Sequence, residues 1–359
     1  MVHPRVIEID IKHYSDTVTE AKTRATDAKI MAVVKANAYG LGASKMATEA
    51  LRAGADFLGV ATPQEALDLL GFGIQAPILL LSEILDTVPV QLLHQNVRFT
   101  VYSPAFIRIL GQLSNETGLD TFVHLKLNTG MNRLGANPGE IVSLLSLIDT
   151  FPRLKLEGLM THFACADTPD HPANAHQLNR FHSALRWLSQ NEKKIPLVHA
   201  ANSDAFHRMA QTSFDMVRLG LSTYRDCVTL KTVLGFLQQV PPGEGVSYGW
   251  HFTLQNPSWI ATLPFGYADG IPSRYGLQGG QVLIKNKRYP IVGKVCMDMM
   301  MVYLGTNPEH LQIGEEVILF GGKKEHAISL LESANWANRN EYEMLCALGP
   351  RVERKYIKK

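Results

Sequence analysis

The chain has 359 residues, more than one hydrophobic core usually serves, so we expect either a barrel of about 250 residues with a smaller domain or two domains of similar size. Hydrophobic residues make up 46% and charged residues 19%, which excludes a disordered chain. The 35 basic and 33 acidic residues leave a net charge of +2, which attracts neither nucleic acid nor an anionic membrane, so we expect a small-molecule partner.

The N-terminus carries charge within its first residues, and no segment reaches about 18 uncharged apolar residues, so we expect a cytoplasmic protein. The four cysteines are far apart and form no CxxC pair, which predicts reduced, mostly buried thiols and no metal site. They are Cys165, Cys227, Cys296 and Cys346. The basic end, Arg351 to Lys359, is interpreted as a solvated terminus rather than an interaction arm.

From about residue 30 to 220, short apolar runs rich in β-branched residues alternate with helical patterns, which is typical of βα units around a parallel sheet. Eight such runs predict a (β/α)8 barrel. They are Ile30–Val34, Phe57–Val60, Pro77–Leu81, Val97–Val101, Thr121–Leu127, Lys155–Met160, Pro196–His199 and Phe214–Val217.

After about residue 230 the pattern changes to alternating, glycine-punctuated stretches, which predict a mainly-β domain. These stretches are VSYGWHFTL, SWIATLPFGYADG, QVLIKNKRYPIVGKV, MMMVYL and EEVILFGG. Lys285-Asn286 is expected to form a tight hairpin turn, and a helical pattern at 326–348 closes the chain. We therefore expect a barrel domain over 1–230 and a β-domain over 231–359, with a first strand at about 4–11 pairing with the β-domain.

Polar residues follow several of the eight runs, at the strand ends where barrels of this type place their reactive groups. They are Lys35, then Lys126 and Arg133, then His162, then Asn202 and Ser203, and finally Arg218, Gly220 and Leu221. All of them are expected to face one mouth of the barrel.

Lys35 has two interpretations: a side chain that reaches solvent, or a desolvated amine that acts as a nucleophile. Taken alone, the first is favoured. However, Ser203 and the glycine-exposed backbone amides after the last two strands lie where such barrels bind phosphate. A lysine together with a phosphate site suggests pyridoxal phosphate as the cofactor.

At this point the sequence resembles the bacterial alanine racemases. VVKANAYGLG is similar to the family's cofactor-lysine signature, and eight further motifs follow in family order over residues 5–357. They are HLKLNTGMNRLG, THFACAD, HAANSD, FDMVRLGLSTY, GVSYG, GYADG, VGKVCMDMMMV and YEMLCALGPRVERKY. The resemblance implies a pyridoxal-phosphate barrel, a C-terminal β-domain and a homodimer in which the partner's β-domain completes each active site.

The resemblance also implies the catalytic roles. Lys35 would carry the cofactor as a Schiff base and move a proton on one face of the substrate Cα, and Tyr248 from the other subunit would serve the opposite face. Arg218 would face the pyridine nitrogen, where an always-charged donor makes the ring a weaker electron sink. His162 would join Arg218 in the polar network around the tyrosine.

Further positions follow from the same resemblance. The cofactor, mainly through its phosphate, would contact Tyr39, Asn202, Ser203, Gly220, Leu221 and Tyr342, and His162 would also bind it. The substrate would contact Arg133 and the backbone amide of Met297, and Tyr267 and Arg274 would line its access route. Lys126 corresponds to a lysine that is often carbamylated and then braces Arg133.

The chain departs from the commoner family pattern at seven positions: Leu41, Asn128, Met160, Leu219, Arg225, Trp250 and Tyr303. The leading interpretation is a racemase that interconverts L- and D-alanine and supplies D-alanine for peptidoglycan. A racemase for serine or for a broader range of amino acids remains an alternative interpretation, because the chain carries Met160, Arg225 and Trp250. An amino-acid decarboxylase is disfavoured by Arg218, and a non-catalytic pyridoxal-phosphate-binding protein is disfavoured by the β-domain.

Overall fold

The computed structural model describes residues 4–307, 309–322 and 326–358. The chain forms two compact units. The barrel unit consists of residues 15–38 and 43–222, and the sheet unit consists of the described residues of segments 1–14, 39–42 and 223–359.

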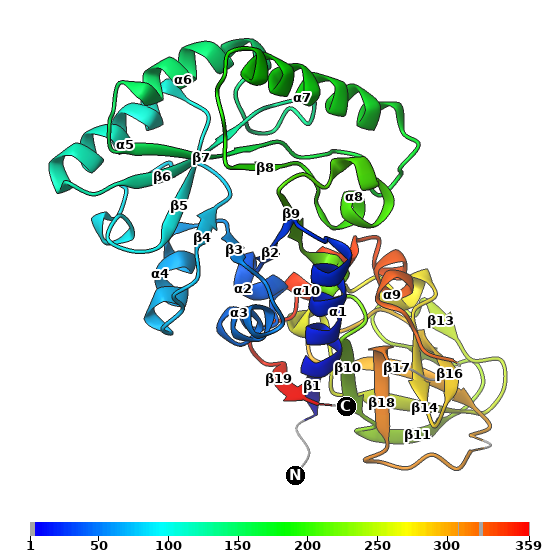
Figure 1. The fold of residues 1–359 in the computed structure, drawn as a ribbon. Coiled ribbons are helices and arrows are strands. Elements are labelled where there is room, and N and C mark those ends of the chain that lie inside the picture. The colour runs from blue at the N-terminus through cyan, green and yellow to red at the C-terminus, as the bar shows by residue number, and fades with distance from the viewer. Residues whose placement is uncertain (1–3, 308, 323–325, 359) are drawn as a thin grey trace. The chain divides into compact units, whose positions relative to one another are not determined.

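Eight parallel strands form the centre of the barrel unit, in the order β8-β7-β6-β5-β4-β3-β2-β9 (Figure 1). They are β2 (Lys29–Val33), β3 (Phe57–Val60), β4 (Ile78–Leu80), β5 (Val97–Val101), β6 (Thr121–Lys126), β7 (Leu154–Met160), β8 (Leu197–His199) and β9 (Met216–Leu219). Between β8 and β9, the amide of Asp215 donates to the carbonyl of Val198 (2.9 Å) and that of Arg218 to the carbonyl of Ala201 (3.0 Å). The predicted barrel is confirmed, with one strand in each of the eight apolar runs.

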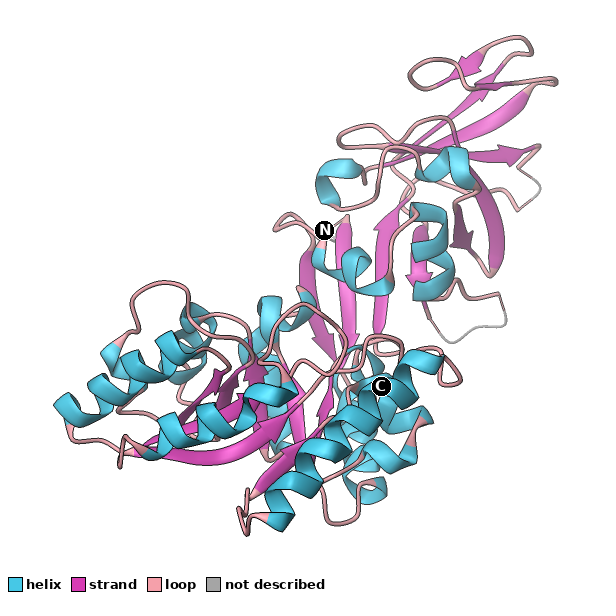
Figure 2. Ribbon diagram, turned by 90° about the horizontal axis from the view of Figure 1, so that it is seen from above, coloured by secondary structure: helices cyan, strands magenta, loops and turns pink. Residues whose placement is uncertain are grey.

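Helices flank these strands (Figure 2). They are α1 (Ile11–Arg24), α3 (Ala43–Arg52), α4 (Pro63–Gly71), α5 (Pro104–Thr117), α6 (Ile141–Asp149), α7 (Pro172–Gln190) and α8 (Ser203–Arg208). Several begin with a capping side chain and a proline, as in Ser103-Pro104, where the serine hydroxyl accepts the Phe106 amide. Inside the barrel, a core cluster is formed by Met31, Phe57, Leu79, Met160, Leu197 and Met216.

The sheet unit contains a nine-stranded sheet, in the order β11-β14-β17-β16-β15-β18-β10-β1-β19. Its strands are β1 (Arg5–Asp10), β10 (Val228–Val233), β11 (Phe236–Val240), β14 (Ser258–Leu263), β15 (Gln281–Ile284), β16 (Lys287–Val292), β17 (Met300–Gly305), β18 (Glu316–Gly321) and β19 (Glu353–Ile357). A small hairpin joins β12 (Gly245–Val246) to β13 (Phe252–Thr253). Lys285 (φ 45°) and Asn286 (φ 65°) form the predicted turn between β15 and β16, since both adopt the positive φ of a type I′ turn.

Two details of the sheet unit differ from the sequence-based interpretation. The basic C-terminus is not a solvated tail, because residues Glu353–Ile357 form β19 and pair in parallel with β1. The helical pattern at 326–348 is divided into α9 (Leu330–Ala337) and α10 (Glu341–Cys346). Asn338 ends α9 in the left-handed conformation, and the Asn340 side chain caps α10.

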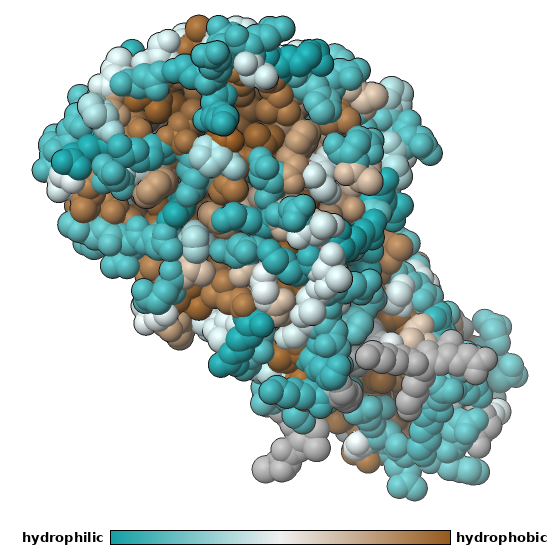
Figure 3. All heavy atoms as spheres, in the orientation of Figure 1, coloured by the Kyte–Doolittle hydropathy of each residue, from teal (hydrophilic) through white to brown (hydrophobic). Residues whose placement is uncertain are grey.

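The cysteines give one further correction, and the surface and the helices bear on the other expectations. All four cysteines are free, but only Cys227 is buried, so the expectation of mostly buried thiols is wrong. On the face drawn in Figure 3, hydrophobic and hydrophilic side chains are mixed over the barrel unit. Within the described residues, no helix combines the length and the apolar character needed to cross a membrane.

Candidate functional site

The site residues expected from the sequence fall in both units. The barrel unit holds Lys35, Lys126, Arg133, His162, Asn202, Ser203, Arg218, Gly220 and Leu221. The sheet unit holds Tyr39, Tyr248, Tyr267, Arg274, Met297 and Tyr342.

Lys35 lies directly after the first barrel strand, at the start of an unusual turn. The next residues, Ala36, Asn37 and Ala38, have φ values of 52°, 54° and 52°, which is left-handed helical backbone. This conformation costs roughly 1–2 kcal/mol for each residue that is not glycine. Such strain is retained mainly at functional sites, where the surrounding structure holds it in place.

Glu65, which the sequence analysis missed, holds this turn. Its carboxylate accepts the amide of Ala36 (2.6 Å) on one oxygen and the amide of Ala61 (2.7 Å) on the other. Glu65 also forms a capping box with Thr62 at the start of α4. The pattern Thr-Pro-Gln-Glu at 62–65 was a visible signal for that cap, but not for the contact with Ala36.

Lys126 shows that the mouth of the barrel is strongly cationic. It is 6% exposed, and its Nζ donates to the carbonyl of Leu81 (3.3 Å). Burial, together with the positive charges of Arg218, Arg133 and Lys35, lowers the pKa of Lys126 to about 8. Four basic side chains therefore act on one another here, which suits a ligand carrying negative charge.

Arg218, on β9, is 4% exposed and is held by four acceptors. Its Nη1 donates to Nδ1 of His199 (3.0 Å), and its Nη2 contacts the carbonyls of Thr161 (2.8 Å) and Ala200 (2.9 Å) and Nδ1 of His162 (3.1 Å). Burial lowers the pKa of Arg218 to about 10, so it stays a cation at neutral pH. Because an arginine can only donate, Nδ1 of His162 must accept. Burial and the charge of Arg218 hold the pKa of His162 well below its usual value, so the ring is neutral with its proton on Nε2.

Hydroxyl and amide groups gather where the seventh and eighth strands end. Asn202 caps α8 by accepting the amide of Ala205 (3.0 Å), and the Ser203 hydroxyl accepts the amide of Gly220 (2.7 Å). The hydroxyl oxygen of Ser222 is buried and has no hydrogen-bond partner among the described residues. Ser222 follows Gly220 by two residues, and an unsatisfied buried hydroxyl there is a good fit for a phosphate, whose oxygens accept several hydrogen bonds.

In the sheet unit, Tyr39 and Tyr342 lie together. Their ring centroids are 5.4 Å apart, and Tyr39 also packs on Tyr224 at 5.0 Å. Arg225 forms a two-pronged ion pair with Glu341, with Nε and Nη2 donating at 2.8 and 2.7 Å. Arg225, one of the departures from the family pattern, thus anchors the start of α10, which carries Tyr342.

Tyr248 is 72% exposed and lines a cavity of about 940 Å³ in the sheet unit. Trp250, Met297 and Met299 also line it and are 61%, 53% and 50% exposed. We call this region the Tyr248 hollow. Large apolar side chains exposed together in this way are typical of a surface that another molecule covers.

Backbone contacts connect the loops around the Tyr248 hollow. The amide of Tyr267 donates to the carbonyl of Cys296 (2.9 Å), and that of Ala268 donates to the carbonyl of Met297 (3.0 Å). The amide of Met297 itself has no acceptor among the described residues. The structure therefore brings Tyr248, Met297 and Tyr267 together, and Arg274 lies exposed a few residues beyond Tyr267.

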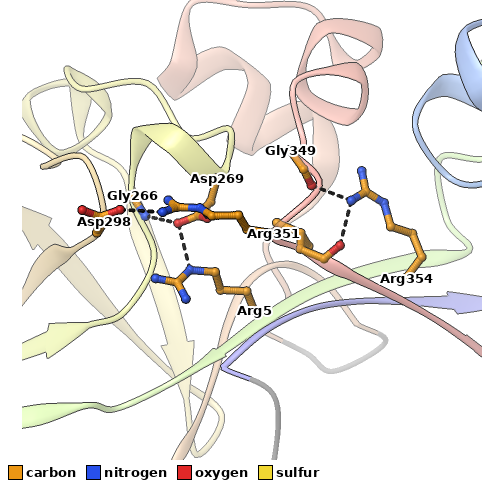
Figure 4. Close-up of polar contacts among 8 residues, drawn as sticks. Arg5, Gly266, Asp269, Asp298, Gly349, Arg351 and Arg354 are labelled. Carbon is orange, nitrogen blue, oxygen red and sulfur yellow. Dashed lines mark hydrogen bonds and ion pairs between the residues drawn. The ribbon is translucent and has the colours of Figure 1, made fainter.

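A buried carboxylate fixes these loops (Figure 4). Asp269 is fully buried and accepts Nε of Arg5 (3.0 Å), Nε of Arg351 (2.9 Å) and the amide of Gly266 (2.9 Å). Arg351 also donates to Asp298 (2.6 Å). Both ends of the chain thus hold the segments that carry Tyr267 and Met297, a role that the interpretation of the C-terminus as a tail had missed.

Two of the other departures, Asn128 and Trp250, make local contacts. The Asn128 amide donates to Asn132 (3.0 Å) within its own loop. Trp250 lies so close over Gly245 that a Cβ there would come within 2.3 Å of the indole ring.

Comparisons with known proteins agree over the whole chain. The family profile described as alanine racemase, N-terminal domain, matches residues 9–227, and that for the C-terminal domain matches residues 227–356. An alanine racemase from Halothermothrix orenii is 35% identical over 374 residues, covering 100% of this chain and 98% of its own. One from Geobacillus kaustophilus is 38% identical over 370 residues, covering 98% and 94%.

Solved structures are equally similar. The alanine racemase of a D-cycloserine-producing Streptomyces lavendulae has a TM-score of 0.93 and 31% identity, covering 100% of this chain and 98% of its own. The alanine racemase from Bacillus anthracis with bound L-Ala-P has a TM-score of 0.89 and 32% identity, covering 100% and 96%.

Proposed function

The chain belongs to the alanine racemase family of pyridoxal-phosphate-dependent isomerases, and from this premise we propose that it interconverts L-alanine and D-alanine. The observation that carries the proposal is the group of four basic residues at the strand ends of the barrel unit, Lys35, Lys126, Arg133 and Arg218. It suits a cofactor phosphate and a substrate carboxylate, which are both anions.

The residues of the barrel unit fit the cofactor. Bound pyridoxal phosphate supplies an electron sink that makes the Cα hydrogen of an amino acid easier to remove. We propose that Lys35 holds it covalently and that Arg218 donates to its ring nitrogen. The phosphate would be held by Ser203, Asn202, Tyr39 and Tyr342, by the amide of Leu221, and by the amide of Gly220, which would exchange the Ser203 hydroxyl for a phosphate oxygen. The unsatisfied hydroxyl of Ser222 is an additional donor that this chain offers.

Two groups would move the proton at Cα. The amine of Lys35 serves one face, and the hydroxyl of Tyr248 from a second copy of the chain serves the other, because racemisation needs an acid or base on each side. His162 supports the tyrosine, since Arg218 occupies its Nδ1 and leaves the Nε2 proton as a donor.

Exposure supports the proposed homodimer. A catalytic tyrosine that is 72% exposed in its own chain is poorly protected from water, whereas a partner that covers the Tyr248 hollow would bury it. The amide of Met297, which has no acceptor among the described residues, would then contact the substrate. Tyr267 and Arg274 would line the access route.

Arg133 would bind the substrate carboxylate and the phenolic oxygen of the cofactor. Lys126 supports it in the form of a carbamate, which arises when its neutral amine adds CO2 and releases a proton. The lowered pKa of Lys126, about 8, supports this step because it provides neutral amine near physiological pH. The wider role, supplying D-alanine for peptidoglycan in the bacterial cytoplasm, rests on the family resemblance alone.

The test is to load the purified protein with pyridoxal phosphate and follow L-alanine by chiral chromatography. We expect an equal mixture of the two enantiomers. Unchanged L-alanine, with the cofactor covalently attached to Lys35, would contradict the proposal.

A broad-specificity racemase is the second candidate, because Trp250 presents a large exposed ring two residues from Tyr248. Turnover of serine, lysine and arginine under the same conditions separates the two. If any of these exceeds alanine, the second candidate is favoured.

A further inference from the structure

A chain of hydrogen bonds leads from Arg218 into the interior of the barrel. Nη1 of Arg218 contacts Nδ1 of His199 (3.0 Å), and Nε2 of His199 contacts Nδ1 of His124 (2.8 Å). Nε2 of His124 contacts Oε2 of Glu157 (3.0 Å), which is also paired with Arg98 (3.0 Å). Both histidines are fully buried. We call these five residues the histidine relay.

The relay runs along the barrel, away from the mouth. In the strand register, His199 lies opposite Met160 at the end of β7, and His124 lies opposite Gly158, two residues earlier. Arg98 lies opposite Phe122, near the start of β6. The relay therefore connects the strand ends that carry Lys35 and Arg218 with the opposite end of the strands.

Two local irregularities make room for the relay. The pairing of β6 and β7 shifts by one residue, since Val123 lies opposite Leu156 and His124 lies opposite Gly158. Glu157 is the extra residue, and such bulges redirect a side chain. A Cβ at Gly158 would come within 2.3 Å of Nδ1 of His124, so the imidazole needs a glycine at this position.

Donor and acceptor chemistry allows one arrangement of protons. Arg218 only donates, so Nδ1 of His199 accepts and its Nε2 carries the proton. Nε2 of His199 then donates to Nδ1 of His124, whose own Nε2 proton goes to Glu157. If His124 were doubly protonated, its Nδ1 proton would force a proton onto Nδ1 of His199, where it would meet the N–H of Arg218.

The electrostatics agree with this arrangement. Burial opposes ionisation of Glu157, but hydrogen bonds from His124 and Arg98 outweigh it and lower the pKa of the carboxyl to about 2. Burial lowers the pKa of His124 despite the neighbouring Glu157, and burial with the charge of Arg218 lowers that of His199 further. The N–H groups that join Arg218, His199 and His124 in sequence thus all point towards Glu157, and bonds aligned in this way strengthen one another.

We propose that Glu157 is a positioning residue that orients and electrostatically balances Arg218 through the protons of His199 and His124. None of the four acceptors that hold Arg218 in the described structure is a carboxylate, and Glu157 supplies the negative end of the hydrogen-bond network. Because the imidazole of His199 is fixed as a hydrogen-bond acceptor, the N–H groups of Arg218 keep their directions and its guanidinium stays protonated. The inference rests on the proposed contact between Arg218 and the ring nitrogen of the cofactor.

The direct test is a neutron crystal structure of the wild-type protein with cofactor, which needs no variant to fold. We expect deuterium on Nε2 of both His199 and His124, bare Nδ1 atoms and an ionised Glu157. Deuterium on Nδ1 of either ring, or on the carboxyl of Glu157, would overturn the proposal.

The variant test compares Glu157→Gln with Asp120→Asn, which makes the same change in an exposed ion pair just before β6. For Glu157→Gln we expect a kcat about tenfold lower with little change in KM, a cofactor dissociation constant about tenfold higher and a shifted absorption maximum of the bound cofactor. Asp120→Asn should behave as wild type.

A purely structural role for Glu157 would lower the melting temperature and leave the cofactor spectrum unchanged, and that result would overturn the proposal. If wild type lacks racemase activity, the proposed function fails, while the neutron structure still tests the relay. If wild type is active and Glu157→Gln matches Asp120→Asn, the relay alone fails.

Discussion

At the strand ends of the barrel unit, the candidate site is buried and bonded within the chain, whereas around Tyr248 in the sheet unit it is exposed. Arg218 and Lys126 are 4% and 6% exposed, while Tyr248 and Met297 are 72% and 53% exposed. Basic side chains buried together raise the free energy of the empty protein and favour an anionic ligand. The exposed side chains favour a second protein surface. The two regions therefore suit different partners: the buried region suits the cofactor, and the exposed region suits the proposed second subunit.

Replacing Lys35 should have the largest effect, because it removes the covalent anchor of the cofactor and one of the two proton-transfer groups. For Lys35→Ala we expect racemisation to fall by at least about 10³-fold. Borohydride reduction followed by mass spectrometry should no longer find the cofactor on the chain. Activity within tenfold of wild type would show that the barrel mouth is not the reacting centre.

Tyr248→Phe tests the exposed region. We expect racemisation to fall by about 10²- to 10³-fold, since a general acid or base is lost from one face only. In D₂O, one enantiomer of alanine should still exchange its Cα hydrogen and the other should not. Tyr289→Phe, which also removes a phenolic hydroxyl from the sheet unit, is the control and should match wild type. Loss of exchange for both enantiomers would contradict the two-sided scheme.

Lys126→Met tests the charge of the barrel mouth through stability. The pKa of Lys126 is about 8 in the folded chain against 10.5 unfolded, so the unfolded state binds more protons between these values and the stability of wild type rises with pH there. Below about pH 8 the full cost, about 3 kcal/mol, applies. In the cofactor-free protein in CO2-free buffer, the variant should therefore be more stable at pH 7, and the difference should shrink towards pH 10.5.

Urea unfolding at the two pH values measures this difference. Lys155→Met, which changes a lysine with a 43% exposed side chain near the start of β7, is the control and should shift stability by no more than about 0.5 kcal/mol. If the Lys126→Met protein is less stable than wild type at pH 7, the contacts of Lys126 compensate the cost of burying its charge, and the prediction is wrong.

Arg225→Ala should have the smallest effect. The side chain of Arg225 is 40% exposed, and ion pairs with such exposure contribute up to about 1 kcal/mol, so the cofactor dissociation constant should rise by at most about fivefold. Lys193→Ala, which breaks an exposed pair with Asp149, is the control. Unchanged cofactor affinity would show that the ion pair of Arg225 does not help Tyr342 to bind the cofactor.

The barrel strands were predictable because continuous apolar runs between helical patterns have few other interpretations. The C-terminal strand β19 was not, since its residues are mostly polar and its place depends on pairing with β1, far away in the sequence. The left-handed turn after Lys35 was hidden because Ala36, Asn37 and Ala38 include no glycine.

The candidate site was predictable where its residues follow strands. The histidine relay was missed because His124 and His199 lie inside apolar runs, where a histidine gives no separate signal. Glu157 becomes informative only through the bulge that redirects it, and a register shift between two strands is a property of the folded barrel.

The most direct test of the account is to mix Lys35→Ala and Tyr248→Phe subunits under conditions that allow exchange. If the barrel mouth of one chain is completed by Tyr248 of the other, each mixed dimer has one intact site. Random exchange should then restore about a quarter of wild-type activity. Activity no greater than the sum of the two variants, in a sample shown to contain mixed dimers, would contradict a shared active site.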